Sequence, residues 1–523
     1  MTLSPAEVVD VLRGPRTAAS LLAREAARRP EDPLVHARGV WSTVGEVHDR
    51  ATAAAVRLVG RGVRPGDVVA TALRGTEAVV ALFAVELAGA IELPLPAGLP
   101  ADRTGGLLDG AGCRLLLSDA AALRTSPGLQ GAVRAGRDVV VLDADLLPGL
   151  PPGTGRLADS PAGPLPSAGT GPLDAGLVLS TSGTTGPPKA VVLPRAAGVR
   201  HARRVVATMA YGPGDVLLNA FPWHHVNVRH AALLPALLSG ARLVVEDGFS
   251  ASDFWGTCRR HGVTAFNFMG AMAAILLRTP ASPVGHRVSR AYGGPAPERL
   301  VREFAERFGV SLLQAYACTE LGDVATNTPD DDRPGSAGRP VPEYELSVVD
   351  PAGDPVPTGT VGRIAVRPRA EGLQLLGHLA DGVLHPAPPG PTFPGDLGRL
   401  DEDGRLWFCG RDTDSVRRRG EHVSAWQVEQ VLAEIPGVVD VAVVGVPSEL
   451  TEEEVLAVLT VTGRQGPDAE AVWRHAAARL PRHEVPRWLR FTPQLPRNAS
   501  QKVDKAALRA LGTAGARERV VRP

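Results

Sequence analysis

The chain has 523 residues and a formal net charge of zero, with 56 basic and 56 acidic residues. This length is too great for one ordinary hydrophobic core, so two or more domains are expected. The balanced charge argues against a protein drawn to nucleic acid or to an anionic membrane by electrostatic attraction. We therefore expect a multidomain protein with neither a nucleic-acid nor a membrane partner.

Cysteine usage and the first residues indicate the compartment. The four cysteines are scattered without metal-ligand spacing, which is typical of a reduced cytoplasm: Cys113, Cys258, Cys318 and Cys409. The first ten residues include Glu7 and Asp10 and contain no apolar core, so no signal peptide is expected. The longest apolar stretch, 78–95, contains Glu86 and Glu92 and is a poor membrane span. We expect a cytoplasmic protein.

Hydrophobic periodicity predicts an α/β architecture in the first part of the chain. Residues 17–29 predict an amphipathic helix that ends before Pro30, and Thr43 predicts the N-cap of a second helix extending to about Val63. The next segments alternate between strand 67–73, helix 76–87 and strand 91–95. This order is typical of parallel strands joined by helices.

The alternation resumes after a stretch rich in Pro and Gly, 147–171, which predicts a loop or an inter-lobe linker. The expected elements are strands 217–220, 241–246, 263–268 and 309–315 and an apolar helix, 231–238. Short strands joined by Gly and Asp turns then predict a β-rich subdomain over 344–366 and 400–408. Beyond a boundary near Gly410, strand 438–446 and helix 469–480 predict a small α+β lid.

The stretch 177–195 combines two apolar runs with a loop that suits an anion. Runs 176–179 and 190–193 predict strands, and small hydroxyl and glycine residues lie between them. Glycines allow close backbone approach, while amides, hydroxyls and a lysine can donate to phosphate oxygens. The loop is not a P-loop, because Pro188 replaces the second glycine and Ala190 the metal-binding hydroxyl. A flexible linker is the alternative, which the close flanking strands disfavour.

This loop resembles the signature loop of the adenylate-forming superfamily, which comprises acyl-CoA synthetases, nonribosomal-peptide adenylation domains and luciferases. The resemblance extends over roughly residues 43–509, nearly the whole chain. It implies a large N-terminal lobe with a β-rich closing subdomain, 1–409, a hinge, 410–414, and a mobile C-terminal lid, 415–523. It also implies that the loop binds the phosphates of ATP through Thr181, Ser182, Gly183, Thr184, Thr185, Gly186 and Lys189.

Residues 291–297, AYGGPAP, predict a turn after a strand. Two adjacent glycines allow a flat ligand to lie against the backbone. In the family a similar loop lies along the adenine, which implies cofactor contacts from Gly293, Gly294 and Pro295.

Residues 314–320, QAYACTE, resemble the family's Tyr-Gly-x-Thr-Glu motif. The match implies that Tyr316 stacks on adenine, Thr319 meets the α-phosphate and Glu320 holds Mg²⁺, a hard cation that takes oxygen ligands. Ala317 replaces the usual glycine, and its methyl group is expected to narrow the acid pocket.

Residues 393–397, FPGDL, resemble a family segment in which an aspartate binds both ribose hydroxyls, which implies that role for Asp396. Arg411 follows a glycine as in the Gly-Arg pair that opens the family's hinge, and it would also meet the ribose. The usual hinge residue, an Asp or Lys, is replaced by Thr413.

The segment 495–503, LPRNASQKV, resembles the family's Pro-Arg-Thr-x-x-Gly-Lys motif, which implies that Lys502 is the catalytic lysine. Asn498 and Gln501 replace the usual Thr and Gly and predict a stiffer loop. The segment 416–429 looks like the part that swings toward the thiol acceptor. Its three arginines would either meet the phosphates of coenzyme A or form a solvated basic surface: Arg417, Arg418 and Arg419.

The stretch 221–230, FPWHHVNVRH, matches an aromatic–His pair that gates the family's acid pocket, with His225 as the functional histidine. The other expected pocket residues are His224, Asn227, Arg229 and His230, together with Phe268 and Gly270 in the segment 267–272. A long alkyl chain would leave such polar groups without partners, at about 1–3 kcal/mol each, so a small polar or aromatic acid is expected. Histidines near their pKa could also manage a proton from an acid or an amine.

The resemblance, which is strongest to the crotonobetaine/carnitine-CoA-ligase-like group, implies an AMP-forming acid–thiol ligase that uses ATP, Mg²⁺ and coenzyme A. Two alternatives remain. One is an enzyme of specialised metabolism that uses ATP and nitrite to convert an aromatic amine to a diazonium. The other is a non-enzymatic relative or one that loads an acid onto a carrier-protein thiol.

Overall fold

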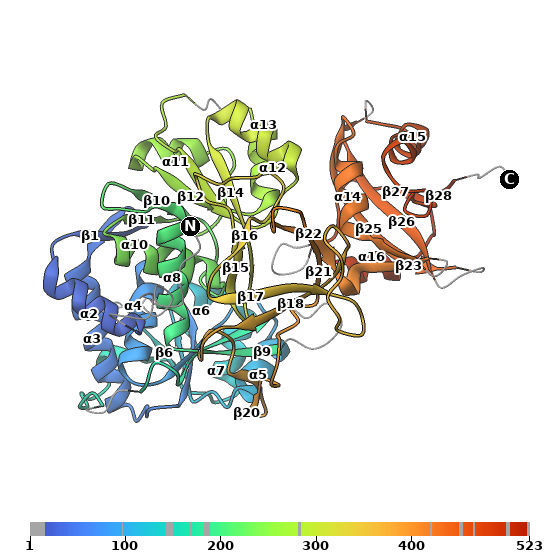
Figure 1. Ribbon diagram of the computed structural model, residues 1–523. Helices are drawn as coiled ribbons and strands as arrows, with labels where there is room; N and C mark the ends of the chain where they lie inside the picture. The colour runs from blue at the N-terminus through green and yellow to red at the C-terminus, as the bar shows by residue number, and fades with distance from the viewer. Residues whose placement is uncertain are drawn as a thin grey trace. The chain divides into compact units, whose positions relative to one another are not determined.

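The computed structural model describes residues 16–96, 98–142, 150–166, 170–181, 189–280, 284–418, 421–448, 453–463, 466–497 and 503–519 (Figure 1). These residues form two compact units. The first unit contains the described residues up to 345 together with 366–391, and the second contains 346–365 and the described residues from 392 onward. No helix within these ranges is long and apolar enough to cross a membrane.

The first unit contains two nine-stranded sheets. In the first sheet six neighbouring strands run parallel, and antiparallel strands lie at both edges. Its spatial order is β16 (Arg339–Pro340), β15 (Gly322–Thr326), β14 (Ser311–Cys318), β13 (Arg290–Gly293), β12 (Ala265–Phe268), β10 (Val216–Asn219), β11 (Arg242–Val245), β1 (Pro33–Ala37) and β2 (Val40–Thr43).

The second sheet has the order β20 (Val383–Pro386), β19 (Gly377–Ala380), β9 (Lys189–Pro194), β8 (Ala175–Thr181), β4 (Ile91–Pro94), β3 (Val68–Ala72), β5 (Leu115–Ser118), β6 (Val139–Val141) and β7 (Gly155–Arg156). The predicted strands 67–73 and 91–95 correspond to β3 and β4, which run parallel as expected. Within the expected loop 147–171, the described residues form the short β7 and a 3₁₀ turn, Leu157–Asp159.

The first two predicted helices are confirmed with their N-terminal signals. Helix α2 (Ala18–Arg28) begins after Thr17, and α3 (Val44–Gly60) begins after Thr43. Each threonine accepts a hydrogen bond from the backbone N–H three residues later, and that residue's side chain bonds back to the threonine N–H. This capping box satisfies two backbone donors that a helix start otherwise leaves open.

Both sheets are buried on both faces. Neighbouring residues of a strand point to opposite sides of the sheet, and in both sheets each side packs into a hydrophobic cluster. In β10, Leu217 packs into one hydrophobic cluster while Val216 and Leu218 pack into another. In β3, Val69 joins the same cluster as Leu217, whereas Val68 belongs to a third. The cluster shared by Leu217 and Val69 therefore lies between the two sheets.

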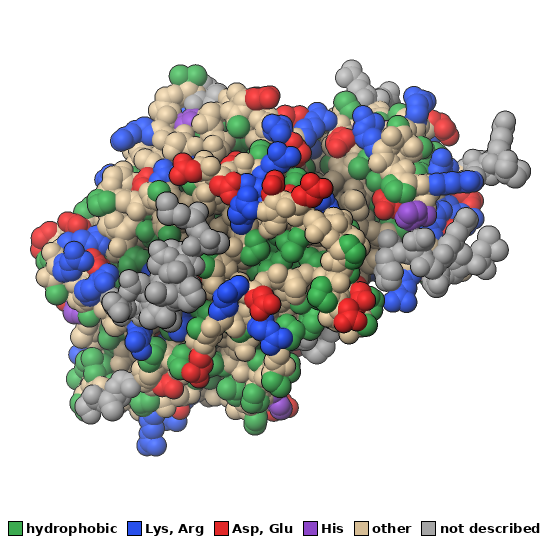
Figure 2. Space-filling view, in the orientation of Figure 1, with side chains coloured by type: hydrophobic (Ala, Val, Ile, Leu, Met, Phe, Trp, Pro, Cys, Tyr) green, Lys and Arg blue, Asp and Glu red, His purple; other side chains and the backbone are tan. Residues whose placement is uncertain are grey.

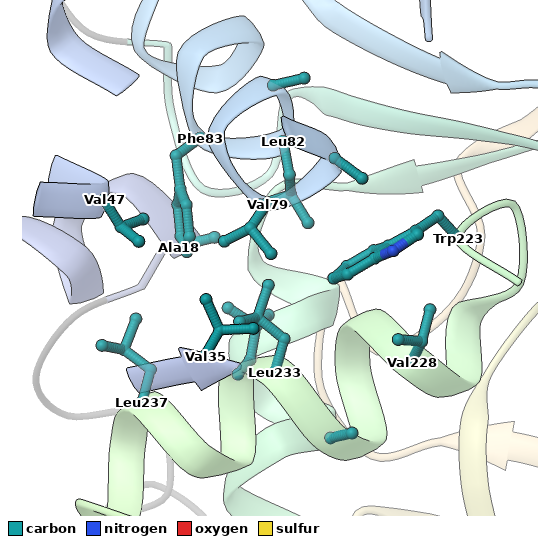
Figure 3. Packing of buried hydrophobic residues seen from close by; sticks show 14 of the residues in the cluster. Ala18, Val35, Val47, Val79, Leu82, Phe83, Trp223, Val228, Leu233 and Leu237 are labelled. Carbon is teal, nitrogen blue, oxygen red and sulfur yellow. The ribbon is translucent and has the colours of Figure 1, made fainter. Parts of the chain in front are cut away.

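Helices fill the space between the sheets and cover their outer faces. The shared cluster contains residues of α2, α3, α4 (Gly75–Leu87), α8 (Ala196–Met209) and α10 (Leu234–Ser239). Figure 3 shows Val79, Leu82 and Phe83 facing Trp223 and Leu233 across this core. The outer helices are α11 (Phe254–His261), α12 (Gly270–Arg278) and α13 (Glu298–Phe308) on the first sheet, and α5 (Ala101–Gly110), α6 (Ala120–Thr125) and α7 (Pro127–Arg134) on the second.

The expected helix 231–238 differs from the observed structure. A π-helical turn, Arg229–Leu233, precedes α10. Pro235 has no N–H and cannot donate to the carbonyl of Ala231, so a regular α-helix cannot run through this point. The Ala231 carbonyl instead accepts from Asn267 Nδ2 at 3.1 Å. The turn thus contains Arg229 and His230, two of the residues expected at the acid pocket, and π-turns often occur at functional sites.

The second unit has a four-stranded sheet of β17 (Tyr344–Val349), β18 (Gly362–Pro368), β21 (Asp396–Leu400) and β22 (Leu406–Arg411), of which β17 begins and β18 ends in the first unit. A hairpin of β23 (Ser415–Arg418) and β24 (Glu421–Ser424) follows. The last sheet has the order β25 (Val438–Pro447), β26 (Glu453–Val461), β27 (Trp488–Phe491) and β28 (Arg517–Glu518), and the helices are α14 (Ala425–Ala433), α15 (Ala469–Arg479) and α16 (Lys505–Ala510). The predicted strand 438–446 and helix 469–480 are confirmed as β25 and α15.

Acidic and basic side chains are interspersed on the face shown in Figure 2. This distribution is in line with the zero net charge of the chain.

Candidate functional site

The loop with the expected phosphate ligands is bordered by two paired strands. β8 and β9 run antiparallel, and Thr181 is the register partner of Lys189. Ser182, Gly183, Thr184, Thr185 and Gly186 lie outside the described residues, as do the side chains of Thr181 and Lys189. Lys502 is also outside the described residues, together with Asn498 and Gln501. The roles expected for these residues stay predictions.

The two glycines that follow β13 have different surroundings. A Cβ on Gly293 would lie 2.2 Å from the carbonyl oxygen of Phe268, its register partner in β12. A Cβ on Gly294 would meet no heavy atom of the described residues within 4 Å. Gly293 is therefore explained by close packing of two strands, whereas Gly294 leaves open space in which a ligand could approach the backbone. Pro295 is partly exposed beside it.

The segment Tyr316–Glu320 forms the end of β14 and the turn into β15. Tyr316 is 3 % exposed, and a β-bulge separates it from Ala317, which is exposed. Thr319 and Glu320 are half-buried, and the Glu320 carbonyl accepts from Leu375 N–H at 2.7 Å. The structure thus leaves the Thr319 hydroxyl and the Glu320 carboxylate more accessible than the Tyr316 ring.

A cavity of about 40 Å³, lined by both apolar and charged side chains, lies against this turn. α8, the π-helical turn, the 319–323 segment and residues 372–374 enclose it. Thr319 and Glu320 line one part, and His201 and Asp323 line another. The volume has room for only a few water-sized groups. The cavity therefore matches a small group and not a long alkyl chain.

The polar residues expected at the acid pocket are largely bonded to the protein. Asn227 Oδ1 accepts from the side-chain amides of Asn219 and Asn267, each at 2.9 Å. Arg229 is 2 % exposed, and its Nη1 donates to Glu92 Oε2 at 2.6 Å while its Nη2 also contacts the same carboxylate. Its Nε donates to the Trp223 carbonyl at 2.7 Å.

These five residues, Asn219, Asn227, Asn267, Arg229 and Glu92, are called the amide–arginine cluster below. The expectation that Asn227 and Arg229 would lack partners beside an alkyl chain is wrong, because the cluster supplies those partners. The preference for a small acid must therefore rest on other groups.

His224 and His225 adjoin this cluster with ring centroids 4.6 Å apart. Burial, followed by the neighbouring His225 and Arg229, lowers the pKa of His224 to about 3. His224 is therefore neutral at pH 7, and the expectation of a histidine near its pKa does not hold for it. His230 is buried as well, and burial lowers its pKa well below the usual value.

Phe268 and Gly270 lie at the end of β12 and the start of α12. Phe268 is 1 % exposed and packs in the cluster between the first sheet and its outer helices. Asn267, on the opposite face of β12, reaches Asn227 instead. Gly270 lies within ordinary contact distance of Pro295, whose carbonyl would be 3.5 Å from an added Cβ. Phe268 is thus packed against Gly293, and Gly270 lies beside Pro295 of the same turn.

The expected ribose-binding residues meet in the second unit. Asp396 and Arg411 are register partners at the ends of β21 and β22, and Arg411 Nε lies 2.8 Å from Asp396 Oδ1. The Asp396 side chain is 4 % exposed, whereas that of Arg411 is 46 % exposed. The pair therefore presents a half-exposed guanidinium held by a buried carboxylate.

Residues Asp412–Asp414 form a single 3₁₀ turn at the expected hinge. Asp414 pairs with Lys505 and Arg509 of α16, each at 3.3 Å, and Arg509 also donates to the Thr413 carbonyl. Ion pairs thus tie the expected hinge to the helix that follows the Lys502 loop.

Arg418 does not belong to an exposed basic run. Its side chain is 10 % exposed, Nε lies 2.6 Å from Glu454, and Nη1 donates to the carbonyls of His483 and Val485. Arg417 is exposed, and Arg419 lies outside the described residues. Both interpretations of this run are therefore wrong for Arg418, which stabilises the second unit.

Sequence reasoning missed the partners of the site. Glu92 interrupts an apolar strand, and a carboxylate in such a strand signals a buried partner, which is Arg229. His201 and Asp323 carry no local motif. A contact between a helix and a turn that lie far apart in the chain leaves no periodic signal.

Two family models cover most of the chain. Residues 22–370 match the AMP-binding enzyme family, and residues 427–502 match the AMP-binding enzyme C-terminal domain. The sulfoacetate–CoA ligase of Cupriavidus necator is 30 % identical over 512 residues, which cover 94 % of this chain and 97 % of that protein.

Other relatives agree with this assignment. The crotonobetaine/carnitine–CoA ligase of Escherichia coli is 28 % identical over 475 residues, covering 86 % of this chain and 89 % of that protein. ATP-bound MatB from Rhodopseudomonas palustris has a TM-score of 0.82 at 26 % identity, over 94 % of this chain and 98 % of that chain. The chain belongs to the AMP-binding enzyme family and is an AMP-forming acid–thiol ligase that activates a carboxylic acid with ATP.

Proposed function

We propose that the chain activates a small polar or aromatic carboxylic acid and transfers it to coenzyme A. A carboxylate oxygen attacks the α-phosphorus of ATP, which gives acyl-AMP and releases pyrophosphate. The sulfur of coenzyme A then attacks the acyl carbon, which gives the thioester and releases AMP. The observation that carries this proposal is the cavity of about 40 Å³ that adjoins Thr319 and Glu320 and contains the side chains of His201 and Asp323 in its lining.

The volume and lining of that cavity support a small substituent on the acid in place of a long alkyl chain. His201 and Asp323 line it, and a long alkyl chain would desolvate them without giving them partners. The names of two relatives, the sulfoacetate–CoA and crotonobetaine/carnitine–CoA ligases, also indicate short, charged acids.

The resemblance gives the remaining roles. Thr319 would contact the α-phosphate, and Lys189, Lys502 and the loop amides would stabilise charge that develops during phosphoryl attack. Asp396 and Arg411 would bind the ribose, Gly293, Gly294 and Pro295 would border the adenine, and Tyr316 would contact its ring. Residues 410–414 would act as a hinge that lets the 415–523 lid serve both half-reactions.

The residues around Glu320 fit a magnesium ion. Mg²⁺ prefers oxygen ligands and is commonly held by one or two carboxylates together with substrate phosphates. A half-buried Glu320 carboxylate beside the Thr319 hydroxyl matches that demand. The described part of the chain contains no group of three metal-ligating side chains that would hold an ion without substrate phosphates. When bound, the ion would neutralise phosphate charge.

The test is pyrophosphate and AMP release with a panel of acids. Fatty acids of increasing length are compared with hydroxy- and amino-substituted benzoates and cinnamates, with and without coenzyme A. We expect release with small acids and thioester only with coenzyme A. Lys502→Ala should lower adenylation about 10²- to 10³-fold, and it should largely spare thioester formation from a supplied acyl-adenylate.

Other outcomes would select an alternative. Turnover of long-chain acids alone would contradict the proposed acid class. Loss of an aromatic amine that depends on nitrite, without thioester, would favour the diazotising reaction. Transfer of the acyl group to a carrier-protein thiol alone would show that the carrier protein, and not coenzyme A, is the acceptor.

A further inference from the structure

The cavity beside Thr319 and Glu320 contains buried polar atoms that the protein does not satisfy. Asp323 Oδ2 and Glu343 Oε2 have no hydrogen-bond partner among the described residues. Both ring nitrogens of His201 are also without one in that part of the chain, although Nε2 lies 3.1 Å from Asp323 Oδ1 without hydrogen-bond alignment. The side chains of His201 and Asp323 are only 7 % and 1 % exposed.

Surrounding groups hold these side chains in place. The Tyr292 hydroxyl donates to Asp323 Oδ1, which leaves Oδ2 as the open acceptor. Glu343 Oε1 accepts from Arg204, which leaves Oε2 open. His201, Tyr292, Asp323 and Glu343 are called the Asp323 cluster below.

The polar atoms of the cavity that lack partners favour a ligand that donates hydrogen bonds. The two carboxylate oxygens only accept, while a neutral imidazole offers one donor and one acceptor. Three of the four open positions thus accept a hydrogen bond. A buried acceptor without a partner is costly, so an occupant with several N–H groups would gain most here.

The charged side chains around the cavity also favour a ligand with an amino group. Glu320, Asp323 and Glu343 face it together with Arg200 and Arg204. Arg204 is engaged with Glu343, and Arg200 donates to the Gly372 carbonyl. Three carboxyl groups thus face two guanidinium groups, both of which already have partners. An amino group suits this balance better than an additional anionic group.

We propose that Asp323, held by Tyr292 and adjacent to His201, binds an amino group that the substrate acid carries at a distance from its carboxylate. This inference rests on the proposed function, in which the carboxylate lies near Thr319. Asp323 Oδ2 accepts from the amino group, and His201 and Glu343 accept its other N–H groups. No covalent step is involved, and the substrate is an amino-substituted short or aromatic acid.

Matched pairs of acids test this assignment with the full-length protein. Ortho-, meta- and para-aminobenzoate are each compared with the corresponding methylbenzoate and hydroxybenzoate, and β-alanine is compared with butyrate. The measured quantity is kcat/KM for pyrophosphate release. For at least one amino-substituted acid of the panel, we expect kcat/KM to exceed that of its methyl-substituted partner by about tenfold to a hundredfold. This is the range for a hydrogen bond to a charged group.

Asp323→Asn locates the effect. This variant should lower the amino-to-methyl ratio at least tenfold through KM for the acid, and it should leave the KM for ATP unchanged. A purely structural role would lower kcat/KM for both partners equally. Glu298→Gln, which changes an exposed carboxylate of α13, is the matched control and should leave the ratio unchanged.

The outcomes separate this inference from the proposed function. Turnover of small acids with equal ratios, or with the hydroxy or methyl partner preferred, overturns the inference and leaves the proposed function standing. Absence of pyrophosphate release with every acid overturns both. Because the wild-type ratio needs no variant, a failure of Asp323→Asn to fold does not remove the test; Tyr292→Phe, which removes the bond to Oδ1, should then shift the ratio in the same direction.

Discussion

Two buried polar clusters lie in the first unit, and they differ in how far the protein satisfies them. In the amide–arginine cluster all three guanidinium nitrogens of Arg229 have acceptors, and Asn227 Oδ1 receives two donors. In the Asp323 cluster, by contrast, Asp323 Oδ2 and Glu343 Oε2 have no partner within the described ranges. Polar residues are buried in both. Within the described residues the first cluster leaves one buried side-chain atom without a partner, Asn267 Oδ1, whereas the second leaves two carboxylate oxygens and both ring nitrogens of His201 open beside a cavity.

The difference shows that polarity alone does not mark a binding site. The first cluster connects β4, β10, β12 and the residues around the π-helical turn, so it positions the segment with His224 and His225. The second cluster borders a cavity beside the expected phosphate-binding turn. We infer that changes in the first should affect stability, and changes in the second should affect which acid is used.

The largest expected effect is on stability, from Arg229→Met. Among the described residues this change leaves the buried Glu92 carboxylate with the Thr71 hydroxyl as its side-chain partner, and it should lower the free energy of unfolding by about 3–5 kcal/mol. The measurement is chemical denaturation. The double variant Arg229→Met/Glu92→Met should be less destabilised, because no unpaired charge remains.

A surface pair provides the control for that experiment. Arg302→Met breaks an exposed pair with Glu298 and should cost no more than about 1 kcal/mol. If Arg229→Met were no more destabilising than Arg302→Met, the amide–arginine cluster would not be the scaffold described.

Asp396→Ala is expected to act on the nucleotide. It removes the carboxylate that holds Arg411 and that is expected to bind the ribose, so ATP binding should weaken by about 1.5–3 kcal/mol. Calorimetry with ATP measures this loss, and the order of preferred acids should stay the same. Glu402→Ala, in the exposed turn between β21 and β22, is the matched control. Unchanged ATP affinity would make Asp396 a structural partner of Arg411 only.

Gly293 and Gly294 provide a second comparison between a position enclosed by the protein and one open to a ligand, with smaller expected effects. Gly293→Ala places a methyl group against the backbone of Phe268 and should cost about 1–3 kcal/mol of stability. Gly294→Ala meets open space and should leave the unfolding midpoint unchanged while weakening ATP binding. Equal unfolding midpoints for the two variants would contradict the distinction between the enclosed and the open glycine.

The effect that is smallest near pH 6 is a pH dependence from His224, which grows as the pH decreases. Its pKa is about 3 in the folded protein, against roughly 6.5 when unfolded, so only the unfolded chain binds a proton between these values. Stability should fall as the pH decreases below about 6.5, by roughly 1.4 kcal/mol per pH unit from this group. Unfolding midpoints of wild type and His224→Phe, compared at several pH values, measure it. Parallel curves would contradict a buried neutral His224.

Local structure was predictable from the sequence because its causes are local. Thr43 marks the start of α3 through its capping box, and apolar runs with turn signals mark β3 and β4. The π-helical turn was not predicted, because the bond that accommodates Pro235 comes from Asn267 on a different element.

The candidate site was predictable only where a motif carried it. The glycine turn, Thr319 and Glu320 follow from their resemblance to family motifs. The ion pair of Arg229 with Glu92 joins residues 137 positions apart, and nothing in the spacing of FPWHHVNVRH distinguishes a bonded arginine from one that faces a substrate. The same limit explains why His201 and Asp323 were missed.

The comparison of the two clusters is tested most directly by one competition measurement. Asn227→Ala and Asp323→Asn are each given an equal mixture of an amino-substituted acid and its methyl partner, and the ratio of the two adenylates is measured. This ratio does not depend on how much of each variant is folded. The account predicts the wild-type ratio for Asn227→Ala and at least a tenfold lower amino-to-methyl ratio for Asp323→Asn. An altered ratio for Asn227→Ala with an unchanged ratio for Asp323→Asn would contradict it.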